Sequence, residues 1–196
     1  MKNIIKNTAI LTAITLVAGI MLGFVYDITK EPIAQAQEAA KKEAWQAVFP
    51  EAAIEDFEAV ELDGSVAEAV VAAIGSKGSV DEVCAVKGGE LGYVVTTTNS
   101  EGYGGDIQIT VGIKADGTVN GVAILSISET AGLGMKATEP SFYEQYHGKL
   151  TDSFYVAKDG GNGEAIDAIS GATITTRAVT NAVNAALGYY LNALAQ

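Results

Sequence analysis

Hydrophobic and polar positions divide the chain into one long apolar segment and a remainder in which the two kinds of residue alternate. Residues 7–26 contain no charged side chain and are rich in Ile, Leu, Val and Ala. At the rise of an α-helix, twenty residues extend about 30 Å, the thickness of the hydrocarbon core of a bilayer. The pattern therefore predicts a single membrane-spanning helix and a membrane anchor over residues 1–27.

A cleaved signal peptide is the alternative interpretation of this segment. The apolar run is longer than the usual core of a signal peptide, and no small-x-small cleavage site follows it before Asp27. Lys2 and Lys6 precede the run, whereas acidic residues dominate directly after it. Because positive charge stays on the cytoplasmic side of a membrane, we expect a single-pass protein of the cell membrane with a cytoplasmic N-terminus and an extracytoplasmic domain over residues 28–196.

Helical periodicity marks both ends of this domain. Apolar residues recur at helical spacing from Glu31 to Val48, and Pro32 suits the first turn of such a helix. We expect core packing for Trp45 near the end of this helix; stacking of its ring on a cofactor is the alternative. A second apolar stripe predicts a C-terminal helix over residues 176–195.

Strand patterns lie between the two helices. Residues 90–98 are rich in Val and Thr, which suit a sheet. Residues 107–114 alternate between apolar and polar positions and residues 119–127 return after a turn, so this region predicts a hairpin. Residues 54–73 are acidic and alternate weakly, which fits mixed strands or a short helix. The fold class is therefore α+β: a transmembrane helix followed by a domain with an antiparallel sheet and flanking helices.

Composition restricts the classes of function. Acidic residues outnumber basic residues 24 to 12, the net charge is −12, and Arg177 is the sole arginine. Nucleic-acid binding is disfavoured because phosphate contacts need clusters of basic side chains. Cys84 alone forms no internal disulfide and no four-cysteine cluster, and its apolar neighbours predict a buried position. With His147 in a polar loop, we expect no metal site and no disulfide-linked partner.

Candidate chemistry is concentrated in residues 167–176, which read Asp-Ala-Ile-Ser-Gly-Ala-Thr-Ile-Thr-Thr. Small residues and hydroxyls stand before a helix here, where unpaired backbone N–H groups favour an anion such as phosphate. A plain helix start is the alternative, because Ser, Thr and Asp are common N-caps. Thr175 and Thr176 can cap the helix or bond to phosphate oxygens, and Arg177 can meet a phosphate or stay at the surface.

Two glycine-rich loops flank the predicted hairpin. Residues 102–106 read Gly-Tyr-Gly-Gly-Asp, and residues 128–134 read Ser-Glu-Thr-Ala-Gly-Leu-Gly. Neither loop fits a phosphate-binding P-loop or a dinucleotide fingerprint. Taken alone, both are compatible with ordinary loop chemistry, since glycine adopts backbone angles that other residues avoid.

The order Asp-x-x-Ser-Gly-Ala-Thr resembles the flavinylation motif of the FMN-binding domain family. In that family the threonine of Ser-Gly-Ala-Thr carries FMN through a phosphoester bond, so the resemblance implies covalent FMN on Thr173. It also implies that Asp167 belongs to the motif that a flavin transferase recognises during maturation. Ser170 completes the motif, and Gly171 and Ala172 present almost no bulk to a modifying enzyme.

The two loops and the motif that follows them, in this order and spacing, resemble the G subunit of the Rnf electron-transport complex over nearly the whole chain. The resemblance places a further set of residues at the cofactor: Tyr103, Glu129, Thr130, Gly132, Leu133 and Gly134. This chain has Ala131 where the family usually has proline, a change that leaves the glycines in place.

The resemblance implies a redox subunit with no catalytic residue of its own. Its complex would couple electron transfer between reduced ferredoxin and NAD to the translocation of sodium or protons, and other membrane and cytoplasmic subunits would be its partners. The C subunit of the sodium-pumping NADH:quinone reductase shares the domain and is the nearest alternative. An anchored FMN domain of another electron-transfer system and a flavin-free scaffold also remain open.

Overall fold

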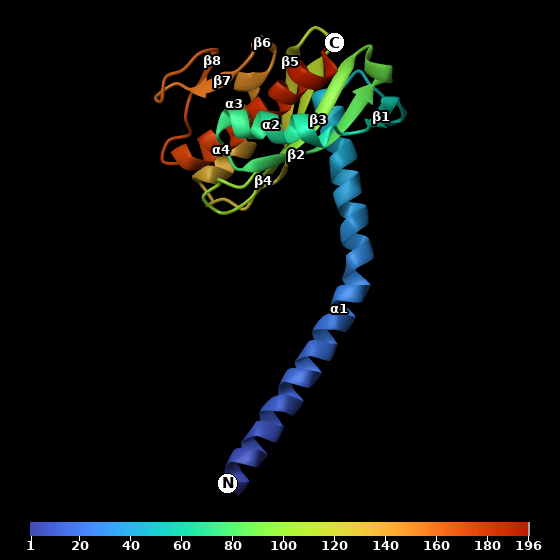
Figure 1. Ribbon diagram of the computed structural model, residues 1–196, viewed down its shortest axis with the longest axis vertical. Helices are drawn as coiled ribbons and strands as arrows, with labels where there is room; N and C mark the ends of the chain where they lie inside the picture. The colour runs from blue at the N-terminus through green and yellow to red at the C-terminus, as the bar shows by residue number, and fades with distance from the viewer. Residues whose placement is uncertain (196) are drawn as a thin grey trace. The chain divides into compact units, whose positions relative to one another are not determined.

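The computed structural model describes residues 1–195 and divides into two compact units, Met1–Lys41 and the chain from Lys42 onward. Helix α1 (Lys2–Val48) begins in the first unit and ends in the second (Figure 1). It is the one helix within residues 1–195 that is long and apolar enough to cross a membrane, and the rest of the chain buries no part of its apolar window. A membrane anchor explains such exposure, whereas the core helix of a globular domain would be covered.

The expected start of a separate helix near Glu31 is wrong. Pro32 lies inside α1, which runs without interruption into the second unit. A proline removes one backbone donor from a helix interior, but residues 34–40 consist of Ala, Gln and Glu, which favour helix. Because helix formation is cooperative, these flanking turns maintain the helix on both sides of Pro32. The membrane boundary at residue 27 stays a prediction.

A six-stranded antiparallel sheet forms the centre of the second unit. Its strands follow chain order from β1 to β6, each paired with the next. They are β1 (Phe57–Val60), β2 (Gly78–Val86), β3 (Gly92–Asn99), β4 (Ile107–Lys114), β5 (Thr118–Ser126) and β6 (Lys149–Leu150). Strand β3 and the hairpin of β4 and β5 confirm the sequence prediction, and the α+β fold class is confirmed with them.

Strand β2 has no clear signature in the sequence. A register shift between Val80 and Glu82 interrupts its alternation, and its last four residues are all buried. A strand covered on both faces has no period-two pattern of polar residues. Cys84 lies in this strand and is 1% exposed, as predicted. The ambiguous residues 54–73 form a 3₁₀ turn, β1 and most of α2 (Gly64–Ile74).

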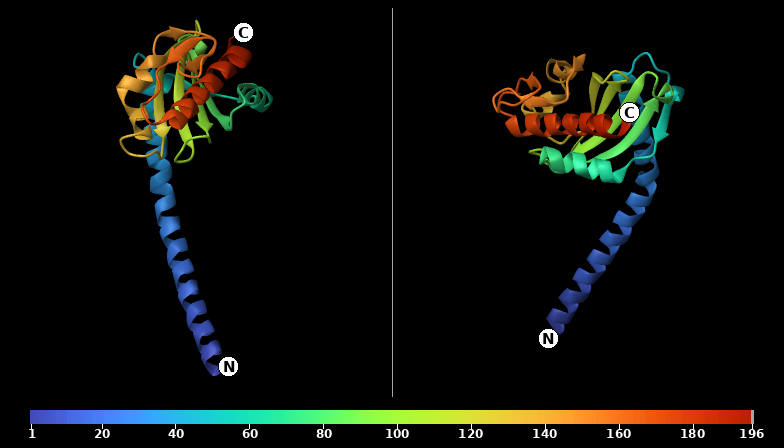
Figure 2. Two further views of the ribbon diagram at one scale, coloured as in Figure 1. Left: turned by 90° about the vertical axis from the view of Figure 1, so that its left-hand side faces the viewer. Right: turned by 45° about the horizontal axis from the view of Figure 1, so that its top comes forward.

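The main core lies between the sheet and helices α2 and α4 (Thr173–Tyr189), which Figure 2 shows side by side on one face. Val83 and Val95 belong to this core, whereas their neighbours Cys84 and Val94 belong to a second cluster. Because successive side chains of a strand point to opposite faces, the second cluster covers the back of the sheet. The end of α1 contributes Val48 to it.

Gly112 and Gly121 allow this close approach of α1. A Cβ atom on Gly112 would lie 2.8 Å from the Cβ of Val48, and one on Gly121 would lie 3.4 Å from its Cα. Trp45 joins the same cluster, where its ring stacks on Phe57 with centroids 5.5 Å apart. Trp45 therefore has the core role that the sequence predicted.

The connection from β5 to α4 is long and mostly irregular. It contains the short helices η3 (Gly134–Thr138), α3 (Pro140–Tyr143) and η4 (Glu144–Tyr146), then β6 and a parallel pair of strands, β7 (Phe154–Val156) and β8 (Glu164–Ile166). Helix α4 then begins at Thr173 and continues into a π-helical turn, Tyr190–Leu194. The sequence predicted the start at Thr176, three residues too late.

Candidate functional site

A cavity of about 510 Å³ lies where the N-terminus of α4 meets two loops of the sheet. Ten residues line it: Tyr103, Glu129, Thr130, Leu133, Gly134, Gly171, Ala172, Thr173, Ile174 and Thr175. The fold thus joins the motif with both glycine-rich loops, and the cavity has the size of a small-molecule site.

The first turn of α4 offers unpaired backbone donors to this cavity. Ala172 is the N-cap residue and no side chain caps the helix, because alanine carries no oxygen. The first N–H groups of a helix have no intrahelical acceptor, and the helix dipole adds positive potential there. Thr173, the first residue of α4, therefore presents its hydroxyl where an anion is favoured.

Thr175 and Thr176, which the sequence suggested as helix caps or as partners of phosphate oxygens, have different surroundings in the structure. Thr176 is buried inside α4, where its Oγ1 donates to the Ala172 carbonyl at 2.9 Å and accepts the Ile169 N–H at 3.1 Å. It braces the turn before the helix, so a bond from Thr176 to a phosphate is not supported. Thr175 is 1% exposed and lines the cavity, and its hydroxyl bonds to no protein group within residues 1–195. A hydroxyl in that position is available to a ligand in the cavity.

Glu129 connects the two glycine-rich loops. Its Oε1 accepts the Gly104 N–H at 3.2 Å. Gly134 is buried beside it: an added Cβ would lie 2.6 Å from Glu129 Oε2 and 2.7 Å from Thr175 Oγ1. Only glycine therefore fits at position 134. Gly132 differs, since an added Cβ would meet nothing within 4 Å, and its φ of +74° favours glycine there for its backbone conformation. It is not among the residues that line the cavity, and its predicted role at the cofactor stays a prediction.

Three large apolar side chains around the cavity are exposed. Tyr103 is 72% exposed, Ile174 48% and Leu133 43%. Single exposed apolar residues are common on protein surfaces, but a group of three at the mouth of one cavity marks a binding surface. A flat aromatic ligand would cover them.

Lys158, which the sequence analysis did not identify as a candidate, contacts the motif at Thr173. Lys158, in the loop between β7 and β8, donates from Nζ to Thr173 Oγ1 at 2.5 Å. Arg177 instead binds Asp159, with Nε and Nη2 at 2.7 and 2.5 Å from the two carboxylate oxygens. These hydrogen bonds lower the pKa of Asp159 and raise the pKa of Arg177. The lysine lies 15 residues before Thr173, and only the tertiary fold brings the two together.

Asp167 and Ser170 are exposed and lie outside the cavity lining. The backbone of Asp167 is held by Gln145, whose Oε1 accepts the Asp167 N–H at 2.7 Å and whose Nε2 donates to its carbonyl at 3.3 Å. This pair of bonds fixes the segment while the carboxylate faces solvent. Such a carboxylate is accessible to another protein.

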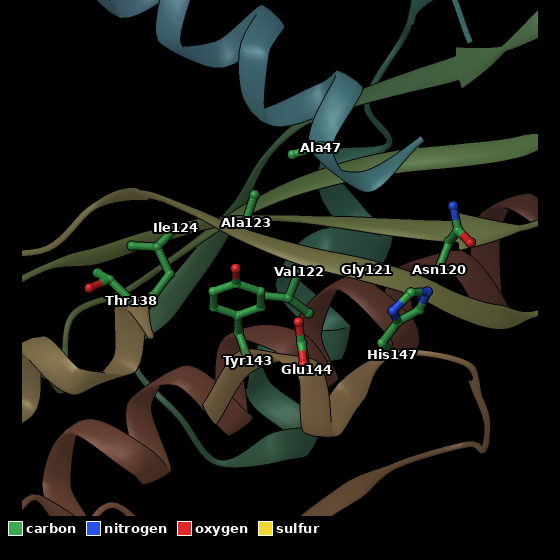
Figure 3. Close-up of a pocket in the computed structure, with 10 residues that line it drawn as sticks. All are labelled: Ala47, Asn120, Gly121, Val122, Ala123, Ile124, Thr138, Tyr143, Glu144 and His147. Carbon is green, nitrogen blue, oxygen red and sulfur yellow. The ribbon is translucent and has the colours of Figure 1, made fainter. Parts of the chain in front are cut away.

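A second cavity, of about 390 Å³, lies between β5, the last turn of α1 and the short helices (Figure 3). Tyr143 points into it in Figure 3, and Glu144 and His147 lie along one side. Asn120 in its wall already donates to the Val48 carbonyl. Within residues 1–195, no group of three or more His, Cys, Asp or Glu residues could hold a metal ion. The cavity at Thr173 is the better candidate, because it contains the motif and the hydroxyl of Thr175, which bonds to no protein group in the described part of the chain.

Comparison with known proteins relates this cavity to a cofactor. Residues 102–188 match the FMN-binding domain, and residues 1–48 match the RnfG N-terminal region. The G subunit of the Na⁺-translocating ferredoxin:NAD⁺ oxidoreductase complex of Acetobacterium woodii is 35% identical, over 97% of this chain and 93% of the relative. The chain belongs to the RnfG family.

A second G subunit shows a similar extent of similarity. The G subunit of the proton-translocating ferredoxin:NAD⁺ oxidoreductase complex of Clostridium ljungdahlii is 33% identical, over 95% of this chain and 91% of the relative.

The C subunit of the Na⁺-translocating NADH-quinone reductase of Parabacteroides distasonis, a solved structure, is 24% identical with a TM-score of 0.44, covering 67% of this chain and 70% of that one.

Membership of the RnfG family makes the chain the G subunit of an ion-translocating ferredoxin:NAD⁺ oxidoreductase complex, with an FMN-binding domain. All ten residues that line the cavity fall within the range that matches this domain. The family and the FMN-binding domain predicted from the sequence are therefore confirmed, and the covalent attachment of FMN stays a prediction.

Proposed function

We propose that this RnfG chain carries FMN covalently on Thr173 and relays electrons to and from other subunits of its complex. The observation that carries the proposal is the position of Thr173, which is both the first residue of the uncapped helix α4 and part of the cavity wall. A phosphoester requires a hydroxyl, and the N-terminus of α4 favours the negative charge that the phosphate retains.

The residues around the cavity fit the two ends of FMN. The phosphate would lie at the start of α4, beside Thr173 and Lys158. The flavin ring would cover the exposed side chains of Tyr103, Leu133 and Ile174, with Glu129 and Thr175 as polar groups for its edge. FMN supplies the redox chemistry when it is bound, while these side chains hold the ring, exclude water from one face and adjust its electrostatic surroundings.

Asp167 supports a role for a maturation enzyme. Its carboxylate is exposed next to the attachment segment, and Gln145 holds its backbone in place. We infer that a flavin transferase reads this carboxylate, together with Ser170, when it delivers FMN to Thr173. Gly171, at a φ of +77°, and Ala172 leave the approach to the threonine open.

The full-length protein purified from cells that contain a flavin transferase is expected to be yellow and to keep its flavin after denaturation. A fluorescent band on a denaturing gel and an intact mass increased by one FMN phosphoester would both report the linkage. Peptide mass spectrometry should then locate the flavin on the peptide that contains Thr173. A colourless protein of unmodified mass would contradict the proposal and favour a flavin-free scaffold.

The proposed topology places the domain outside the cytoplasm. A cysteine at Ser141, which is exposed, should react with a membrane-impermeant thiol reagent in intact cells, because Lys2 and Lys6 hold the N-terminus inside. Native Cys84 is buried and gives little background. A cysteine at Asn3 is the matched control and should react only after the membrane is opened. The reverse labelling pattern would mean that the orientation is wrong.

A further inference from the structure

Lys158 stands out because a charged side chain directly contacts the proposed attachment hydroxyl. Its Nζ lies 2.5 Å from Thr173 Oγ1, and within residues 1–195 no carboxylate lies within ion-pair distance of it. Arg177, the other cation near the start of α4, is neutralised by Asp159. The Asp159 carboxylate is bonded to Arg177 and attracts Lys158 only over a longer distance, so the positive charge of Lys158 is available to an anion on Thr173.

The loop that carries Lys158 is clamped onto α4. The carboxylate of Asp159 receives two hydrogen bonds from Arg177, one helical turn beyond Thr173. The Asp159 N–H also donates to the Val156 carbonyl at 2.8 Å, which ties the loop to the end of β7. Lys158 is thus held between two fixed points, so its contact with Thr173 follows from the fold of the loop.

We propose that Lys158 is a positioning residue for the attachment of FMN and the counter-ion of the phosphodiester that results. This inference rests on the proposed attachment at Thr173. Before attachment, the ammonium group donates to the hydroxyl oxygen and orients it. After attachment, the same group faces a phosphodiester with one negative charge, and the unpaired N–H groups of α4 add to the attraction.

The chemistry of attachment requires a donor in which the FMN phosphate is activated, because water competes with any direct condensation. A flavin dinucleotide such as FAD supplies this activation as a pyrophosphate. The oxygen of Thr173 forms a bond to the flavin-side phosphorus, the bond from that phosphorus to the bridging oxygen breaks, and AMP leaves with the electron pair. The hydroxyl proton passes to a base of the transferase, since a protonated Lys158 cannot accept it.

The experiment measures attachment directly, in full-length protein purified without flavin and then mixed with FAD and a purified flavin transferase. The variants are Lys158→Met, which removes the charge, and Lys158→Arg, which keeps it. Lys149→Met is the matched control, because Lys149 pairs with Glu164 at 3.0 Å and has no contact with Thr173. Lys158 is exposed, and Lys158→Gln provides a second neutral variant should Lys158→Met fail to fold.

Lys158→Met is expected to lower the initial rate of covalent labelling about tenfold to a hundredfold, the value of one charge-assisted hydrogen bond. Lys158→Arg should recover much of the rate, and Lys149→Met should match the wild type. In fully loaded protein, the ³¹P resonance of the phosphodiester should shift in Lys158→Met and not in Lys149→Met.

Equal labelling rates in Lys158→Met and Lys149→Met would overturn the proposal. A slow rate that Lys158→Arg does not improve would also overturn it, because a purely structural role would then explain the loss. An unchanged ³¹P resonance would remove the counter-ion role. If the attachment proposal itself is wrong, the wild-type peptide containing Thr173 will gain no FMN. This result differs from a failure of the Lys158 proposal, in which the wild type still gains FMN.

Discussion

Replacement of Thr173 by alanine is expected to abolish covalent flavin completely. Alanine has no oxygen to form the phosphoester, and the neighbouring hydroxyls do not replace it. Thr176 Oγ1 is buried in bonds to Ala172 and Ile169, and Thr175 is 1% exposed inside the first turn of α4. In-gel flavin fluorescence and intact mass of the denatured protein measure the loss.

Thr173→Ser is the control for this experiment. Serine keeps the hydroxyl within reach of Lys158, so a covalent flavin is expected to form at a measurable rate. Both variants should remain folded, because Thr173 is only half-buried at the first position of α4 and its Oγ1 bonds to a single surface lysine. If flavin remains bound to Thr173→Ala after denaturation, the covalent attachment lies at another residue and the assignment to Thr173 is wrong.

Gly134→Ala is expected to disturb the flavin cavity directly, because the added methyl group meets two residues of the cavity wall. The added Cβ would lie 2.6 Å from Glu129 Oε2, 2.7 Å from Glu129 Cβ and 2.7 Å from Thr175 Oγ1. Because part of this contact is to Cβ, rotation of the Glu129 side chain cannot relieve it. Such overpacking costs about 1–3 kcal/mol of the free energy of unfolding. The melting temperature should fall by roughly 2–12 °C, given about 2–4 °C per kcal/mol for a unit of this size.

The flavin should report the same disturbance. Glu129 and Thr175 are the polar groups of the proposed ring site, so their displacement is expected to change the absorption and fluorescence of the bound flavin. The covalent bond should still form, because Thr173 belongs to the separate segment at the start of α4. Gly64→Ala is the matched control, since an added Cβ there meets nothing within 4 Å and its φ is not positive.

A Gly134→Ala protein with the melting temperature and flavin spectrum of the wild type would remove this loop from the site. Gly132→Ala distinguishes the two effects of replacing a glycine, which are steric crowding by the added Cβ and backbone strain at a positive φ. Position 132 has open space but a φ of +74°, so the expected cost there is backbone strain of about 1–2 kcal/mol and no steric contact with Glu129. Crowding is therefore specific to position 134, although both glycines belong to the same loop.

The local sequence pattern was sufficient to predict the helices and strands that bury one face and expose the other, and the long apolar helix. The strands of the hairpin from Ile107 to Ser126 alternate clearly, and the twenty uncharged residues before Asp27 indicate a helix that needs no partner in the chain. Strand β2 escaped prediction because helices cover one of its faces, the end of α1 covers the other, and a bulge interrupts its register. Burial on both faces removes the contrast on which periodicity depends.

The sequence by itself determined the candidate residues to which the proposal assigns the chemistry of this protein: the hydroxyl of Thr173, the small residues before it and the two glycine-rich loops. These candidates are recognised from residue type and from the order of neighbouring residues, and the sequence alone contains both. Only the tertiary structure decided that Thr176 braces a turn, that Arg177 pairs with Asp159, and that Lys158 reaches Thr173. The physical reason is that hydrogen bonds and ion pairs act over about 3–4 Å, while the groups that make them lie many residues apart in the chain.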